Sequence, residues 1–468
     1  MKTFGPNTRG SYLATLLVAA APLCLALGPG LPCGAALTVQ TEHQNQTNSQ
    51  GAGAQPASPF LDMLKSPNAD TRTKAARQLG KSGDRSVVPA LVSALADPSV
   101  KVRREVVIAL ATLGTPESLD ALVTASKDPD SDVRVTAIDG LVGHYTGQTP
   151  TTGFVGFMKK SYSRAKSHFE PNDTRIDPGV SVDPKVVSGL IAAMNDSRSI
   201  EPAREAAKGL GALLARPAVP DLIKAAHSTD EDLAREALNS LSKIRDTSAG
   251  PQLTDLLDSS NQYVRRDAAL AIGVLRTKEA APKLQNIYRG SDKKDKEAAL
   301  QALADIGDPG SDPIFMEALA STDKRFRALG AEGLGQARDA AAVPELQKAL
   351  QAEKDANARL AMSYALAALG NNDALGALVD SLDSTLHGDT AQTYLIQFCQ
   401  DPQLLPRLYP YLDRKDATIR KRLCTVLVYT GNQTSLEPLQ RLSHDKNNDV
   451  ALEALRALRA VRARTASS

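Results

Sequence analysis

Apolar and polar positions between residues 86 and 114 alternate with the spacing of two short amphipathic helices. The first helix is expected to open at Pro89 and to end before Pro98, because proline disfavours the helical conformation for the residue that precedes it. The second is expected to end at Gly114, a residue type that commonly closes helices. A helix pair of this size buries too little apolar surface to be stable alone, so neighbouring segments must complete its core.

The same pattern recurs along most of the chain with a period close to 31 residues. One large apolar residue in each second helix serves as an anchor for the alignment of the units. The anchors are Leu79, Leu110, Leu141, Leu210, Leu241, Ile272, Leu303, Leu334, Leu366, Leu427 and Leu458. A small or apolar residue lies four positions before each anchor, and a basic residue lies seven positions before it in most units. This repetition predicts a helical solenoid of about twelve units.

Several of these units resemble HEAT repeats, and more narrowly the short, regular HEAT-like repeats found in phycobilin lyases and many bacterial proteins. The resemblance is carried by segments such as VKVRREVVIALATLG and YVRRDAALAIGVL, and it extends over about residues 60–462. It implies an all-α fold in which about twelve antiparallel helix pairs stack into a right-handed α-α superhelix without a sheet. It also implies a ladder of ion pairs between adjacent units, built from residues such as Asp97 and Arg103. The architecture serves many unrelated roles, so it says little about function.

The amino-terminal residues have the order of a secretory signal peptide. Lys2 and Arg9 precede an apolar run, and small residues near Ala35 offer a cleavage site. An uncleaved anchor and a lipoprotein are the alternatives. The expected organisation of the chain is a signal peptide at 1–36, a flexible linker at 37–59, repeats 1–3 at 60–144, an insertion loop at 145–182, repeats 4–12 at 183–462, and a tail at 463–468.

Two departures from the repeat are the candidate partner-binding sites, because specificity must come from places where the repetition fails. The insertion concentrates aromatic and basic residues and is the first choice, with a packing flap as the alternative. Its candidate contact residues are Phe154, Phe157, Lys159, Lys160, Tyr162, Arg164 and Phe169. The second candidate is an aromatic region with Tyr394, Tyr409 and Tyr411. In this region Gln397 stands where an anchor belongs and Thr390 stands where a base belongs, and local packing is the alternative explanation.

The chemistry of the sequence predicts neither a catalytic site, nor a metal, nor a cofactor. The HEAT-repeat enzyme deoxyhypusine hydroxylase holds iron with repeated His-Glu pairs, and this sequence contains no such pair. The 55 basic and 53 acidic residues nearly balance, which argues against a nucleic-acid binder. Cys399 and Cys424 lie in adjacent units and are expected either as free buried thiols or as a disulfide.

These features favour a non-enzymatic, exported scaffold that binds another protein in the bacterial periplasm or envelope. One alternative is an enzyme on the same fold, such as a bilin-lyase-like protein. Clustered titratable groups in a concave pocket would distinguish the enzyme from the scaffold. The other alternative is an adaptor that contacts a membrane surface through the insertion at 145–182.

Overall fold

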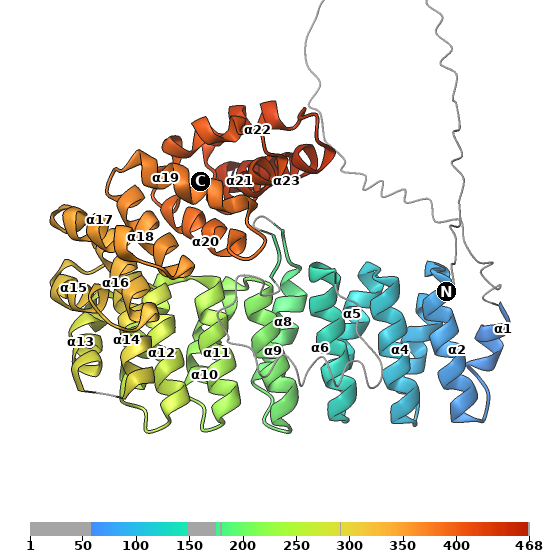
Figure 1. Ribbon diagram of the computed structural model, residues 1–468. Helices are drawn as coiled ribbons and strands as arrows, with labels where there is room; N and C mark the ends of the chain where they lie inside the picture. The colour runs from blue at the N-terminus through green and yellow to red at the C-terminus, as the bar shows by residue number, and fades with distance from the viewer. Residues whose placement is uncertain (1–57, 148–174, 178–179, 291, 467–468) are drawn as a thin grey trace, which may run out of the picture. The chain divides into compact units, whose positions relative to one another are not determined.

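The computed structural model of the protein describes residues 58–147, 175–177, 180–290 and 292–466 (Figure 1). All regular structure in these ranges is helical, and they contain no strand. None of their helices is both long enough and apolar enough to cross a membrane. The seven insertion residues named above as candidate contacts lie between residues 148 and 174, outside the described ranges.

Twelve helix pairs make up the described chain, which confirms the predicted helical repeat. The first helices are α1 (Ser58–Met63), α3 (Val88–Ser93), α5 (Pro116–Ala125), α8 (Pro184–Met194), α10 (Val219–Ala226), η4 (Thr247–Asp258), α13 (Ala281–Gly290), α15 (Asp312–Leu319), α17 (Val343–Ala352), α19 (Asn372–Asp380), η9 (Leu405–Asp413) and α22 (Leu436–Leu442). The second helices are α2 (Ala69–Ser82), α4 (Val100–Leu113), α6 (Ser131–Thr146), α9 (Ile200–Ala212), α11 (Glu231–Ile244), α12 (Gln262–Val274), α14 (Lys293–Ile306), α16 (Lys324–Ala337), α18 (Ala356–Ala368), α20 (Gly388–Phe398), α21 (Ala417–Thr430) and α23 (Asn448–Ala466).

Second helices of consecutive units pack against one another along the array, for example α12 on α14 and α14 on α16 (Figure 1). Some of these contacts require glycine. A Cβ atom on Gly273 would lie 2.6 Å from the Cα of Ala302, and one on Gly335 would lie 2.7 Å from the Cα of Ala365. The helices therefore approach each other more closely there than any side chain would allow.

The anchor residues form the centre of the core, as the sequence predicts. None of the eleven anchor side chains is more than 5% exposed, and most are fully buried. Gln397, in the slot where the anchor is missing, is only half-buried. Cys399 and Cys424 are both buried and unbridged, so the structure favours free thiols over a disulfide. The last helix continues to Ala466, beyond the repeat boundary expected at residue 462.

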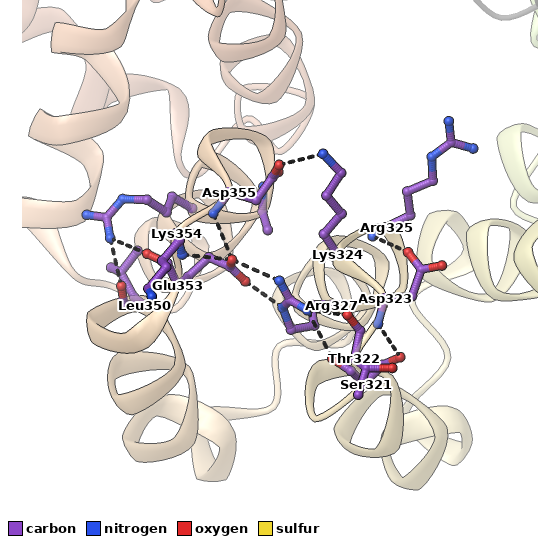
Figure 2. A network of polar contacts seen from close by, with 12 residues as sticks. Ser321, Thr322, Asp323, Lys324, Arg325, Arg327, Leu350, Glu353, Lys354 and Asp355 are labelled. Carbon is purple, nitrogen blue, oxygen red and sulfur yellow. Dashed lines mark hydrogen bonds and ion pairs between the residues drawn. The ribbon is translucent and has the colours of Figure 1, made fainter.

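A ladder of arginine–carboxylate pairs joins adjacent units, and Figure 2 shows one of its rungs. The Arg327 guanidinium donates from Nε and Nη2 to the two carboxylate oxygens of Glu353 in the next unit, at 2.6 and 2.9 Å. Its Nη1 donates to the carbonyl oxygens of Ser321 and Thr322, at 3.1 and 3.0 Å. The Glu353 carboxylate also accepts the backbone N–H of Asp355 at 2.8 Å. One arginine thus binds free carbonyl groups in the turn of its own unit and orients the carboxylate in the turn of the next unit.

Arginine–carboxylate pairs between adjacent units recur along the array and confirm the predicted ladder. The rungs are Arg72–Asp97, Arg103–Asp128, Arg204–Asp230, Arg235–Asp267, Arg265–Asp295, Arg327–Glu353 and Arg420–Asp445. The Arg72 side chain holds the pKa of Asp97 below its usual range by hydrogen bonding, against the opposing effect of burial. Arg327 likewise lowers the pKa of Glu353 to about 2.

The segment 175–177 connects the fourth unit to the last two units. The Ile176 N–H donates to the carbonyl oxygen of Ala212 at 2.9 Å. Asp177 pairs with Arg456 of α23, with 2.9 Å between Oδ2 and Nε. The Arg175 guanidinium lies 5.1 Å above the ring centre of Tyr429 in α21.

We predict that Arg103→Ala lowers the free energy of unfolding by about 3 kcal/mol or more, because it leaves the Asp128 carboxylate buried without its partner. The two side chains are only 13% and 9% exposed. Lys101→Ala is the matched control, since Lys101 and Asp70 form an ion pair with side chains 66% and 67% exposed. That loss should stay within about 1 kcal/mol. Thermal and urea unfolding followed by circular dichroism measure both, and equal losses would contradict the structural role of the ladder.

Candidate ligand-binding site

The first or second residue after the second helix adopts a left-handed backbone conformation in much of the array. Glycine occupies this position in several units, at Gly83, Gly114, Gly147 and Gly307. Arginine occupies it in three others, with φ of 57° at Arg245, 52° at Arg276 and 58° at Arg338. A side chain in this conformation costs about 1 kcal/mol relative to glycine. The three arginines are therefore present despite a backbone cost that glycine avoids.

Two of these arginines line a cavity of about 410 Å³. Its walls come from α12, α14 and α16 and, facing them, from α20 of the irregular tenth unit. Thr390 and Gln397, the two residues that break the repeat pattern, both belong to the α20 wall. The third arginine, Arg338, instead forms an ion pair with Asp401.

Two carboxyl groups in the cavity have raised pKa values. Burial raises the pKa of Asp305 to about 6, although Arg245 and Arg276 partly oppose this shift. Burial also raises the pKa of Glu332 to about 7, and the charge of Asp305 adds to the shift. Each acid has a neutral hydrogen-bond donor: Gln301 Nε2 lies 3.3 Å from Asp305 Oδ2, and the Tyr394 hydroxyl lies 2.5 Å from Glu332 Oε1.

The two cavity arginines lack carboxylate partners among the described residues. Arg276 Nη2 donates to the amide oxygen of Gln400 at 3.1 Å. The Arg245 side chain makes no hydrogen bond or ion pair within the described chain. Crowding by protein atoms lowers the pKa of the Arg245 guanidinium, and repulsion from Arg175 and Arg276 adds to this effect. The cavity therefore holds two cations and two acids that are near one another without forming an ion pair.

A second concave region, which we call the basic groove, lies beside this cavity and shares Leu270 and Gln301 with it. The basic groove has a volume of about 480 Å³ and is formed by α11, α12, α14 and α16. Its charged lining residues are Arg235, Arg266, Lys294, Arg325, Asp267 and Glu297. Tyr263 is 46% exposed in it, with the Arg235 guanidinium 5.2 Å above its ring centre. Leu270, Ala298 and Leu329 supply apolar surface.

The three tyrosines singled out from the sequence have different environments. Tyr394 is buried in the cavity wall and stacks on Tyr364, with 5.3 Å between ring centres. The Tyr409 hydroxyl lies 2.6 Å from Thr434 Oγ1 in the next unit. The Tyr411 hydroxyl donates to the carbonyl oxygen of Asn372 at 3.3 Å. Tyr409 and Tyr411 thus connect neighbouring units, and the role of all three in partner binding stays a prediction.

The sequence analysis missed the four charged residues of the cavity, Arg245, Arg276, Asp305 and Glu332. Two signals could have indicated them. Arginine replaces glycine at a position that favours glycine, and each of the two acids lies within a second helix only two residues from an apolar anchor, Leu303 or Leu334. Their convergence on α20 is not visible in the repeat pattern.

Stacked pairs of antiparallel helices, joined by an arginine–carboxylate ladder, define the class of α-solenoid proteins with short tandem repeats. Within that class the chain belongs to the HEAT-repeat family. The family's sequence profile, described as HEAT repeats, matches residues 57–142, 187–273, 250–329 and 313–395, which together exceed half of the chain. No curated protein matches the chain.

Solved structures similar to the chain include proteins of quite different kinds. An engineered protein is 19% identical, with 87% of this chain and 98% of that chain covered and a TM-score of 0.37. The CpcE–CpcF complex of phycocyanin lyase from Nostoc sp. PCC7120 is 17% identical, with 70% and 99% covered and a TM-score of 0.25. The karyopherin Kap121p, bound to the extreme C-terminus of the protein phosphatase Cdc14p, is 14% identical, with 86% and 49% covered and a TM-score of 0.41.

We predict that Arg245→Gly raises the free energy of unfolding by about 0.5 to 1 kcal/mol, because glycine adopts the left-handed conformation without strain. Gly114→Ala is the reverse control. Gly114 has φ of 60°, and an added Cβ would lie no closer than 3.5 Å to a neighbouring atom, so the change isolates the backbone cost. This control should lose about 1 kcal/mol. Thermal unfolding measures both, and a destabilised Arg245→Gly would show that the guanidinium supports the fold.

Proposed function

We propose that the chain is a non-catalytic scaffold whose basic groove binds an acidic, partly apolar stretch of another protein. The carrying observation is the lining of the groove, where basic side chains from four helices border an apolar floor. Arg235, Arg266 and Arg325 each pair with a carboxylate of the chain, so an acidic partner would share or replace those pairs. Tyr263 adds an exposed aromatic ring, a side chain that is common at the centre of interfaces. Because the lining residues come from consecutive second helices, they repeat at regular intervals and suit an extended segment of a partner.

One observation favours the alternative of an enzyme. Asp305 and Glu332 place two carboxyls with raised pKa values in one cavity, and such groups occur at catalytic sites as well as in structural networks. The structure thus contains the clustered titratable groups that the sequence analysis set as the mark of an enzyme. We keep protein binding as the proposed function, because binding requires only complementary charge and contact area, and the basic groove provides both.

The proposed site predicts that the double variant Lys294→Glu, Arg325→Glu weakens partner capture by at least about tenfold, because it reverses two of the four positive charges. Crosslinked proteins captured from the native envelope by the wild type and by the variant are compared by quantitative mass spectrometry. Lys348→Glu is the control, since Lys348 is 80% exposed on α17, outside the groove. If the double variant and the control variant both capture a protein as efficiently as the wild type does, the groove is not the binding site of that protein.

We also propose that the chain is exported to the bacterial envelope. The support is the order of charged, apolar and small residues over positions 1–36. Intact-mass measurement on protein from the native host should give a mature chain that begins near Ala36 or Leu37. A chain that retains Met1 would indicate an uncleaved anchor or no export. A lipid-modified Cys24 or Cys33 at the start would indicate a lipoprotein.

A further inference from the structure

We infer that the cavity between α20 and helices α12, α14 and α16 binds a small zwitterion of amino-acid size. Its carboxylate would pair with Arg245 and Arg276, and its ammonium would lie against Asp305 and Glu332. This site is separate from the proposed partner interaction, and its test uses no partner protein.

The first support is the unmatched charge inside the cavity. Arg245 and Arg276 line the same cavity as Asp305 and Glu332. Both arginines are exposed to solvent, and neither forms an ion pair with a carboxylate of the described chain. Most other arginines of the second helices form direct pairs, as Arg266 does with Asp295 at 2.5 Å. Opposite charges that line one cavity without pairing can each bind an opposite charge of a single small molecule.

The second support is the backbone position of the two arginines. Both have positive φ, where glycine serves the same turn in other units. A residue held in a sparsely populated conformation can mark a functional site. Leu214 also has a positive φ, so the backbone supports the inference only together with the two arginine side chains that line the cavity. The guanidinium group is also the side chain best suited to a carboxylate, because it can donate two parallel hydrogen bonds.

Other ligand classes fit the cavity less well. An inorganic anion would pair with the arginines but would meet Asp305 and Glu332 as like charges. A simple cation would be repelled by Arg245 and Arg276. A neutral sugar carries no charge, so it would form no ion pair with any of the four groups. A molecule with one carboxylate and one ammonium satisfies both pairs.

The cavity also has the size and the access for such a ligand. Its volume of about 410 Å³ lies at the lower end of the range for small-molecule sites. Thr393 and Gln400 are exposed in its wall and provide polar surface at the opening. Thr393 belongs to α20, the helix where the repeat pattern fails, and Gln400 follows that helix, so the irregular unit completes the site.

The experiment measures thermal unfolding of the full chain at pH 8 with each of the standard amino acids, followed by calorimetry with the best one. The expected result is a rise in the unfolding midpoint of about 2 °C or more with at least one amino acid. Its N-acetylated form, which lacks the ammonium, and its amide, which lacks the carboxylate, should give no rise. Arg245→Gly and Glu332→Gln should each weaken binding by at least about tenfold.

Two further measurements make the outcome decisive. Lys348→Glu, on the distant face of α17, should bind as the wild type does, and circular dichroism should show that both cavity variants keep their helical content. Glu332→Gln keeps an oxygen that can accept from Tyr394, so loss of binding with an intact fold reports the charge. The inference is overturned if no amino acid shifts the midpoint, if the shift survives in Arg245→Gly, or if phosphate or the N-acetylated form acts equally well.

Discussion

The bidentate contact between one arginine and the carboxylate of the following unit is the constraint on which the array depends. Each turn between paired helices exposes carbonyl groups that no helix satisfies, and Arg327 binds two of them while it reaches Glu353. The carboxylate in turn accepts backbone N–H groups of its own turn. These polar contacts alone relate neighbouring units in spacing and direction. The anchors then fill the space that this framework leaves.

The repeat pattern predicts the fold because each unit depends mainly on its neighbours, and neighbours have nearly the same sequence. The burial of Leu241 and the pairing of Arg103 with Asp128 follow from the 31-residue period. The cavity could not be predicted in this way. Its two walls are brought together by contacts such as Tyr394 with Glu332 and Arg276 with Gln400, which are 62 and 124 residues apart. No periodic signal relates positions at such separations, although Gln397 marks the unit where the pattern fails.

The basic groove and the cavity show two ways in which one array produces binding surfaces. The groove follows the repeat, because successive second helices each present a basic side chain beside apolar ones. The cavity instead depends on an exception, because α20 departs from the pattern and faces three earlier helices. The two regions share Leu270 and Gln301, so they are adjacent in the array.

The contact of segment 175–177 with the last units changes the mechanics of the chain. A solenoid whose units touch only their neighbours behaves as a spring and extends gradually under tension. Here Asp177 and Arg456 join points 279 residues apart, and Arg175 reinforces the junction on Tyr429. The two ends of the stretch between these residues, which includes the cavity and the groove, can therefore move apart only after the junction breaks.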